Sequence, residues 1–502
     1  MSPTLLKSVC DVAEERIYAM KQESLKRNFV MNAILTMSSF IFPIITFPYV
    51  SRILQPVGTG KVSFAVSVVN YFSMFAQLGI PTYGIRICAQ VRDDRRELTR
   101  TAHELLMING CMSLFSYAAF FISLFLVPRF QSEKILFMIV SLTILFNTIG
   151  MEWLYKALEQ YTYITVRSVF FKFIALIALF ALVHSKSDYV IYGGISIFAA
   201  SASNILNFVN ARKYIDFANV GPYHPKKHLK AVFIFFAMAC ATTVYTNLDT
   251  VMLGLMKTDT DVGYYNAAVR IKTILVSIVT SLGTVLLPRS SYYIEHGEIE
   301  EFHRISAKAA NFVIVLAVPM MLFFILYARP GIYLLSGEAY EGSVIPMQII
   351  MPTLLFIGLT NVFGIQMLVP LGGERFVLYS EIAGAVCDLI INWLLIPKYA
   401  SSGAAIGTLA AEAIVLIVQV AALGHELVFM KNMPYVKVGA AACMAVCASF
   451  WVLRLSVGNF LMLLIGSVCF FGVYGGVLLI LGEPMTREIL QMLIQRIRNV
   501  NR

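Results

Sequence analysis

Charged residues are scarce in this sequence. Only 14% of its 502 residues are Asp, Glu, Lys or Arg, while 58% are hydrophobic. An average soluble domain contains about 25% charged residues, so this composition excludes an ordinary water-soluble protein. The composition therefore indicates an integral membrane protein.

Motifs that carry catalysis or metal binding are also absent from the sequence. The eight cysteines include no CxxC pair, which argues against structural zinc and against a disulfide framework. There is no GxxxxGK[ST] phosphate-binding loop and no HExxH zinc motif, the signatures of nucleotide hydrolysis and of zinc proteases. We therefore expect no metal site, no bound cofactor and no ATP hydrolysis by this chain.

Long connections between the apolar stretches are absent as well. The longest are about 20 residues, near 211–230 and 288–308. A membrane enzyme that joins glycans usually needs an extramembrane domain to hold donor and acceptor in reacting geometry. The sequence therefore favours a transporter over an enzyme, with a membrane glycan polymerase as the alternative from a different class.

Fourteen apolar stretches dominate what the sequence does contain. The bilayer core is about 30 Å thick, so a spanning helix needs roughly 20 apolar residues. Stretches of about this length cover 28–50, 63–83, 103–127, 135–155, 164–183, 190–209, 231–255, 264–287, 309–328, 344–370, 377–396, 404–424, 438–453 and 460–482. We predict an all-α integral membrane protein with about 14 transmembrane helices.

Basic residues concentrate in every second gap between these stretches. If the N-terminal tail is cytoplasmic, 26 of the 39 Lys and Arg residues lie in tails and inward loops, 9 in outward loops and 4 within stretches. The positive-inside rule then places both termini in the cytoplasm. The net charge of +10 therefore reflects membrane topology, and we expect no nucleic-acid partner.

Two short motifs recur about half a chain apart. Residues 147–154 match 361–368 at an offset of 214, and Gly60 parallels Gly263 at an offset of 203. Such repeats are typical of secondary transporters, although chance similarity among apolar helices would also produce them. We predict two six-helix lobes and two C-terminal helices, arranged as a cytoplasmic tail (1–27), an N-lobe (28–209), a cytoplasmic linker (210–230), a C-lobe (231–424), the last two helices (438–482) and a second cytoplasmic tail (483–502).

Basic residues inside the stretches are candidate substrate ligands. A charge near the bilayer centre costs about 2.5–3.5 kcal/mol on insertion scales, so such a residue normally faces a partner or a water-filled cavity. They are Arg167, Lys172, Arg270 and Lys272, with Arg52 just beyond the first stretch. Arg donates paired hydrogen bonds that fit a phosphate, and Lys supplies a compact charge. We predict that these five residues line a cationic cavity, with Arg52 and Arg270 best placed to bind a diphosphate.

Four of the acidic residues inside the stretches form a second candidate group. They are Glu152, Asp249, Asp388 and Glu412. Burial can raise the pKa of a carboxyl group toward the working pH, so these residues could couple transport to an H⁺ or Na⁺ gradient. The alternative is a structural ion pair between helices, such as Asp249 with Arg270, and Arg52 could equally be an interface anchor.

Three groups of motifs resemble one known family across nearly the whole chain. The first runs Pro48-Tyr-Val-Ser-Arg52-Ile-Leu, Gly58-x-Gly60 and Leu78-Gly-Ile-Pro81-x-Tyr-Gly84-Ile-Arg86. The others are Thr246-Asn247-Leu-Asp249-Thr-Val-Met-Leu-Gly254 with Gly263-Tyr-Tyr-Asn266-Ala-Ala-Val-Arg270-Ile-Lys272, and Asp388-x-x-x-Asn392. Together they resemble the Wzx-type bacterial polysaccharide flippases of O-antigen or capsule repeat units, in the multidrug/oligosaccharidyl-lipid/polysaccharide exporter superfamily.

The resemblance implies a fold and a cargo. The fold is a MATE-like pair of six-helix lobes with two peripheral helices and a cationic central cavity. The cargo is an undecaprenyl-diphosphate-linked oligosaccharide, which we expect to move by alternating access to the outer leaflet of the bacterial plasma membrane. Membrane lipids and the polysaccharide polymerase machinery are the further expected partners. A flippase for peptidoglycan precursors or teichoic-type glycans, or a multidrug exporter of the same fold, is the alternative.

Overall fold

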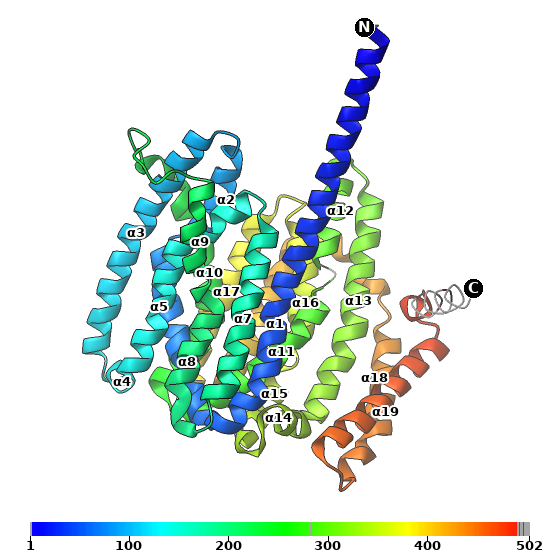
Figure 1. The fold of residues 1–502 in the computed structure, drawn as a ribbon. Coiled ribbons are helices and arrows are strands. Elements are labelled where there is room, and N and C mark those ends of the chain that lie inside the picture. Colours follow the sequence, from blue (N-terminus) through cyan, green and yellow to red (C-terminus); the bar gives the residue numbers. More distant parts are fainter. Residues whose placement is uncertain (1–2, 282, 489–490, 492–494, 496–502) are drawn as a thin grey trace. The chain divides into compact units, whose positions relative to one another are not determined.

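The computed structural model describes residues 3–281 and 283–488, together with residues 491 and 495. Within that part of the chain every regular element is a helix (Figure 1). The α-helices of the first half are α1 (Pro3–Gln77), α2 (Ile80–Gln90), α3 (Arg95–Leu126), α4 (Pro128–Gln131), α5 (Lys134–Gly150), α6 (Glu152–Ala157), α7 (Tyr161–Leu182), α8 (Tyr189–Ile197), α9 (Asn204–Asn210) and α10 (Lys226–Met256).

The second half continues in the same way. Its α-helices are α11 (Asp259–Val279), α12 (Gly283–Glu295), α13 (Ile299–Leu326), α14 (Ala328–Ser336), α15 (Val344–Ile350), α16 (Thr353–Thr360), α17 (Glu374–Leu423), α18 (Tyr435–Phe450) and α19 (Asn459–Ile480). Short 3₁₀ segments cover Lys186–Asp188, Ala211–Lys213, Glu338–Ser343, Gly424–Asn432 and Trp451–Arg454, and π-helical segments cover Phe198–Ala202 and Asn361–Leu368. The predicted all-α class is therefore confirmed.

Eight helical segments of the described chain are long and apolar enough to cross a membrane, and ten if each of two bent pairs counts as one span. The predicted number of fourteen stays a prediction. The lower count has a structural reason, because α1 and α17 each run through two predicted stretches. Their backbones leave the helical region at Gln55 (φ 58°) and Ala400 (φ 47°), which is uncommon for residues other than glycine and turns the chain there.

The chain divides into two compact units, which we describe separately. Unit 1 comprises residues 1–47 and 68–240, and unit 2 comprises residues 48–67 and 241–502. Unit 1 therefore contains α2 to α9 with parts of α1 and α10. Unit 2 contains α11 to α19 with the middle of α1 and the second part of α10. The lobe boundaries proposed from the sequence stay a prediction.

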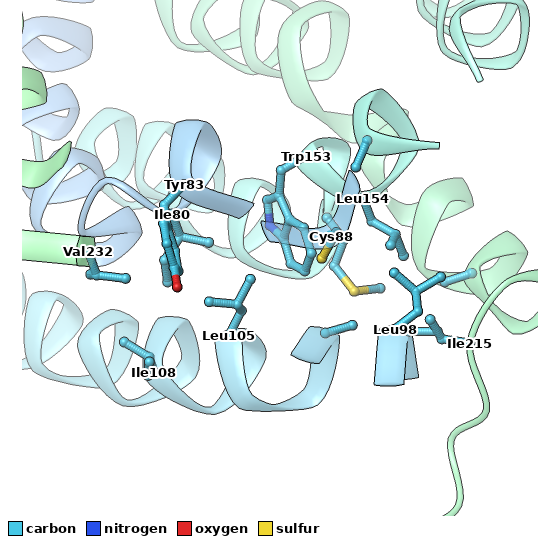
Figure 2. Close-up of a cluster of buried hydrophobic side chains, with 14 of the residues drawn as sticks. Ile80, Tyr83, Cys88, Leu98, Leu105, Ile108, Trp153, Leu154, Ile215 and Val232 are labelled. Atoms are coloured by element: carbon cyan, nitrogen blue, oxygen red, sulfur yellow. The ribbon is translucent and has the colours of Figure 1, made fainter. Parts of the chain in front are cut away.

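A cluster of buried apolar side chains in unit 1 lies where α2, α3 and α6 meet (Figure 2). Its labelled members are Ile80, Tyr83, Cys88, Leu98, Leu105, Ile108, Trp153, Leu154, Ile215 and Val232. Close packing of such side chains excludes water and holds the helices in one arrangement. Because Ile215 belongs to the cluster, the segment that follows α9 packs against these helices.

A buried carboxylate also holds the segment between α9 and α10 against α3. Glu104 of α3 is fully buried and accepts hydrogen bonds from the backbone N–H of His224 at 2.7 Å and from Lys227 Nζ at 2.8 Å. Nε2 of His228 lies 2.8 Å from the same carboxylate, and its Nδ1 lies 2.7 Å from the Tyr83 hydroxyl. A buried charge is tolerated when it is paired and hydrogen-bonded in this way. The network joins α2, α3 and the start of α10.

One helix contact of unit 1 recurs in unit 2. Gly150 at the end of α5 lies against the side chain of Asn204 on α9, and Gly364 lies against the side chain of Gln419 on α17. The two glycines are 214 residues apart and their partners 215 residues apart. This recurrence supports the internal repeat that was predicted from residues 147–154 and 361–368.

Candidate functional site

Glu152 is the first residue of α6 in unit 1. Met151 immediately before it has a left-handed backbone (φ 41°), which ends α5 at Gly150 and begins a new helix. The Glu152 carboxylate lies 2.8 Å from Lys156 Nζ on the same helix and 3.9 Å from Arg167 Nη2 on α7. The structure thus brings this predicted acidic residue together with one of the predicted cations.

Arg167 is the most deeply buried of the predicted cations. Only 6% of the residue is exposed, and its guanidinium lies 5.9 Å from the centre of the Tyr163 ring. Its Nε and Nη1 atoms have no hydrogen-bond partner in the described part of the chain. A guanidinium has five N–H donors in a planar fork, a geometry that matches phosphate. Arg167 therefore has donors that an anionic ligand could occupy.

Lys172 lies further along α7 and connects it to α1. Its Nζ donates hydrogen bonds to the hydroxyl groups of Ser38 and Ser39, both at 2.9 Å. It also interacts electrostatically with Glu152. Glu152, Arg167 and Lys172 form a group that we call the unit 1 charge cluster.

Asp249 of α10 is the centre of a second group, in unit 2. One carboxylate oxygen accepts hydrogen bonds from the hydroxyls of Tyr265 and Thr408, the latter at 2.8 Å. The other oxygen accepts a hydrogen bond from Asn392 Nδ2 at 2.6 Å. The donors come from α11 and from both halves of α17, so the turn at Ala400 is what brings Asn392 and Thr408 to the same carboxylate.

Asp388 lies one helical turn before Asn392 and faces the same region. Only 1% of Asp388 is exposed. Among the described residues, neither Oδ1 of Asp388 nor Oδ1 of Asn392 has a hydrogen-bond partner. A Cβ built on Gly407 would lie 2.8 Å from Asp388 Oδ1 and would overlap Asn392 Oδ1. Both unpartnered oxygens therefore lie close to the bare backbone of Gly407.

Lys272 and Glu412 complete this group. We call Asp249, Asp388, Glu412 and Lys272 the unit 2 carboxyl cluster. Lys272 of α11 interacts electrostatically with both Asp388 and Glu412, and Glu412 is 6% exposed. The cluster thus contains three buried carboxyl groups and one ammonium. Like charges in one buried site cannot all ionise unless a cation or a proton balances them.

Arg52 has a structural role in unit 2. Its Nη1 donates to the carbonyl oxygen of Pro48 at 2.7 Å, and its Nη2 donates to that of Leu334 in the last turn of α14. The carbonyl groups at the C-terminal end of a helix lack partners within the helix, so a cation stabilises them. Arg270 is half-buried on α11, two residues before Lys272. The predicted binding of one diphosphate by Arg52 and Arg270 together stays a prediction.

The five predicted cations are divided between the units. Arg167 and Lys172 lie in unit 1, whereas Arg52, Arg270 and Lys272 lie in unit 2. The single cationic cavity expected from the sequence therefore stays a prediction. Sequence reasoning missed Tyr265 and Thr408 as partners of Asp249, because neither residue has a spacing that indicates the contact. Asn392 could have been found from the spacing Asp388-x-x-x-Asn392, which places both residues on one helix face.

The fold of this chain has a counterpart among solved structures. The structure is similar to that of a lipid II flippase, MurJ, in an inward closed conformation, with a TM-score of 0.72 at 14% identity over 92% of this chain and 100% of that chain. At this identity the likeness establishes the fold alone. The helical fold with its long apolar helices defines a multi-pass membrane protein.

Sequence comparison identifies the family. The profile described as polysaccharide biosynthesis protein matches residues 25–294, and the MatE profile matches residues 234–394. The chain therefore belongs to the polysaccharide biosynthesis protein family, and the resemblance to the polysaccharide flippases of this superfamily is confirmed.

Two curated relatives agree with this assignment. A putative O-antigen transporter of Escherichia coli (strain K12) is 24% identical over 394 residues, which are 78% of this chain and 95% of the relative. A putative O-antigen transporter of Shigella dysenteriae is 22% identical over 396 residues, which are 78% of this chain and 98% of the relative. These relatives are transporters, so the expectation of a transporter rather than an enzyme is confirmed.

Proposed function

We propose that this protein is a flippase for lipid-linked oligosaccharides. Its cargo is a repeat unit attached to undecaprenyl diphosphate, and it moves that headgroup from the inner to the outer leaflet for surface polysaccharide biosynthesis. The relatives named as O-antigen transporters and the MurJ-like fold support transport of a lipid-linked glycan. The structural observation that carries the proposal is Arg167, a buried guanidinium within an apolar helix whose Nε and Nη1 are unpartnered in the described chain.

The proposed binding step uses the unit 1 charge cluster. A diphosphate accepts paired hydrogen bonds from a guanidinium fork, and low polarity around a buried site strengthens each charge interaction. Lys172 supplies a second cation on the same helix, and Glu152 interacts with both Arg167 and Lys172. The sugar then occupies hydrated space while the polyprenyl chain stays in the lipid, and alternating access exposes the headgroup on the other side.

The proposed location is the bacterial plasma membrane, with both termini in the cytoplasm. The distribution of Lys and Arg supports this orientation, because 26 of 39 would lie on the cytoplasmic side and the positive-inside rule favours that arrangement. The polysaccharide polymerase machinery would then meet the cargo on the opposite face of the membrane.

The proposed energy source is a cation gradient acting on the unit 2 carboxyl cluster. Its unpartnered oxygens on Asp388 and Asn392 and its excess of carboxyl groups suit a proton or a hard cation such as Na⁺, because hard cations prefer oxygen ligands. Asp249, Asp388, Asn392 and Thr408 would contribute those oxygens, and binding would neutralise the buried charge.

The proposed cargo can be tested in intact spheroplasts after depletion of this protein. An impermeant sugar-modifying reagent reports which leaflet holds undecaprenyl-diphosphate-linked oligosaccharide, and mass spectrometry identifies the accumulated species. The expected result is accumulation of completed repeat units that the reagent cannot reach. Accumulation of peptidoglycan precursor instead would reassign the cargo, and normal accessibility of all lipid-linked glycans would refute the proposal.

A further inference from the structure

Unit 2 contains a partly open cavity beside the carboxyl cluster, lined by both polar and apolar residues. It has a volume of about 220 Å³ and is lined by residues of α10, α16, α17 and the π-helical segment Asn361–Leu368. Glu412 belongs both to the wall of this cavity and to the carboxyl cluster, and it lies one helical turn after Thr408. The cavity is therefore adjacent to the oxygens around Asp249.

The lining of the cavity is rich in hydrogen-bond acceptors. Glu381 contributes a second carboxyl group, and Glu381 and Asp249 both interact electrostatically with Glu412. Gln419 is 3% exposed, and its Nε2 donates to Ser380 at 3.2 Å while its Oε1 has no hydrogen-bond partner in the described chain. The hydroxyl of Tyr245 is also buried, and it interacts with the carboxylate of Glu412. Buried acceptors are normally satisfied, so unpartnered ones beside a cavity indicate a ligand or ordered water.

The charges of the lining determine the sign of that ligand. Glu381 and Glu412 are both acidic. Lys272 interacts electrostatically with Glu412, but it interacts with Asp388 as well, so it balances the charge of both groups only in part. Carboxylate, amide and hydroxyl oxygens are the ligands that hard cations prefer. An anionic or purely apolar ligand would leave these groups unbalanced.

The size of the cavity distinguishes it from the carboxyl cluster. In the cluster, polar atoms lie at hydrogen-bond distances such as 2.6 and 2.8 Å, so an ion could enter only without its water. A water occupies about 30 Å³ in the liquid, and a cavity of 220 Å³ can therefore hold a small cation with several waters.

We infer that this cavity binds a hydrated monovalent cation of the Na⁺ type before the ion loses its water and enters the unit 2 carboxyl cluster. Glu381 and Glu412 supply the charge, and the Gln419 carbonyl and Tyr245 hydroxyl accept hydrogen bonds from the ion's water. The inference rests on the proposed cation coupling. It assigns Glu381 the capture of the ion, whereas Asp249 belongs to the coupling site itself.

Equilibrium binding of ²²Na⁺ to the purified full-length protein tests this assignment, with choline chloride keeping the ionic strength constant. Glu381→Gln should weaken Na⁺ binding about tenfold, as expected for the loss of one nearby charge in a partly hydrated site. The charge-preserving Glu381→Asp should restore most of the affinity. The matched control is Glu374→Gln, which removes an exposed carboxylate at the start of the same helix and should leave binding unchanged.

Failure of this inference is distinguishable from failure of the coupling proposal. A Na⁺ affinity of Glu381→Gln equal to that of the wild type would overturn the cavity assignment. It would not affect the proposal that the unit 2 carboxyl cluster is the coupling site. No Na⁺ binding to the wild type, together with flipping that ignores both Na⁺ and pH gradients, would overturn the coupling proposal and the inference with it. If Glu381→Gln does not fold, Gln419→Met removes the unpartnered acceptor at similar volume, and unchanged Na⁺ affinity in that variant would equally overturn the assignment.

Discussion

Gly60 and Gly263 contact each other where the middle of α1 crosses α11 in unit 2. A Cβ on Gly60 would lie 2.9 Å from the backbone nitrogen of Gly263 and would overlap the carbonyl oxygen of Asp259. A Cβ on Gly263 would overlap the carbonyl oxygen of Pro56. Glycine at both positions therefore allows the two backbones to touch, as at other close crossings of membrane helices. The sequence had matched these two residues as corresponding positions of the two halves.

Gly263→Ala should destabilise the protein. The added methyl group meets backbone atoms that cannot move separately, and overpacking of this kind costs about 1–3 kcal/mol. Thermal unfolding of the purified protein in detergent measures the effect. Gly110→Ala on α3 is the control, because no heavy atom lies within 4 Å of a Cβ added there. Equal stability of the two variants would contradict the close crossing.

Arg167→Ala should abolish export of the lipid-linked oligosaccharide, and Arg167→Lys should restore little of it. Lys keeps the charge but lacks the planar fork that donates two parallel hydrogen bonds to phosphate. Export is measured as surface polysaccharide, with membrane insertion checked by immunoblot. Arg375→Ala removes an exposed guanidinium near the start of α17 and should export normally. Full export by Arg167→Lys would show that only the charge is needed.

Arg270→Ala should also abolish export while the protein still inserts in the membrane. Arg270 is half-buried on α11 within a motif that resembles the flippase family, and the prediction assigns it to the diphosphate. Surface polysaccharide and membrane abundance are measured in the same cells. Normal polysaccharide in this variant would remove Arg270 from the proposed binding site.

Asp249→Asn should uncouple flipping from the cation gradient and lower stability. An amide presents one accepting oxygen where the carboxylate presents two, so one of the donors from Tyr265, Thr408 or Asn392 loses its acceptor at a cost of about 1–3 kcal/mol. Flipping in proteoliposomes with imposed Na⁺ or pH gradients measures coupling. The control is Asp93→Asn in the exposed loop between α2 and α3. Unchanged gradient dependence in Asp249→Asn would exclude this cluster as the coupling site.

Glu483, just beyond α19, should make stability depend on pH. Burial raises the pKa of this carboxyl group, but hydrogen bonds from Thr486 and Asn311 outweigh that effect and lower the pKa below its ordinary value. Those bonds measure 2.6 Å from the Thr486 hydroxyl and 2.8 Å from Asn311 Nδ2. A carboxyl group with a lowered folded-state pKa stabilises the fold above its unfolded pKa of about 4.3, and the contribution disappears as pH falls through the folded-state pKa.

The stability difference between wild type and Glu483→Gln should therefore be present at pH 7 and shrink under acid conditions. Thermal unfolding at a series of pH values measures it, and Glu300→Gln, an exposed residue in the first turn of α13, is the control. A difference that stays constant down to the acid limit would show that the ionised form of Glu483 has no special role.

The sequence singled out several residues that the structure places in clusters. Glu152, Arg167 and Lys172 were chosen for charge and depth alone, and they lie together in unit 1. Asp249, Asp388 and Glu412 lie together in unit 2, and the first two also belong to motifs that resemble the flippase family. The alternative pairing of Asp249 with Arg270 stays a prediction, and the structure shows hydrogen bonds to Asp249 from Tyr265, Thr408 and Asn392. The hydroxyl partners, Tyr265 and Thr408, have no charge or spacing pattern by which a sequence could reveal them.

Hydropathy and charge along the chain were sufficient to establish the helical membrane class and to select buried ionisable residues, because the cost of placing each segment or charge in lipid depends on local composition. The partner of each charge depends instead on where the backbone leaves the helical region. Gln55, Met151 and Ala400 do so with positive φ values, although none is a residue that normally indicates a turn. The break at Ala400 and the helix packing around it bring Asn392 and Thr408 to Asp249, and such contacts arise only when distant segments fold together.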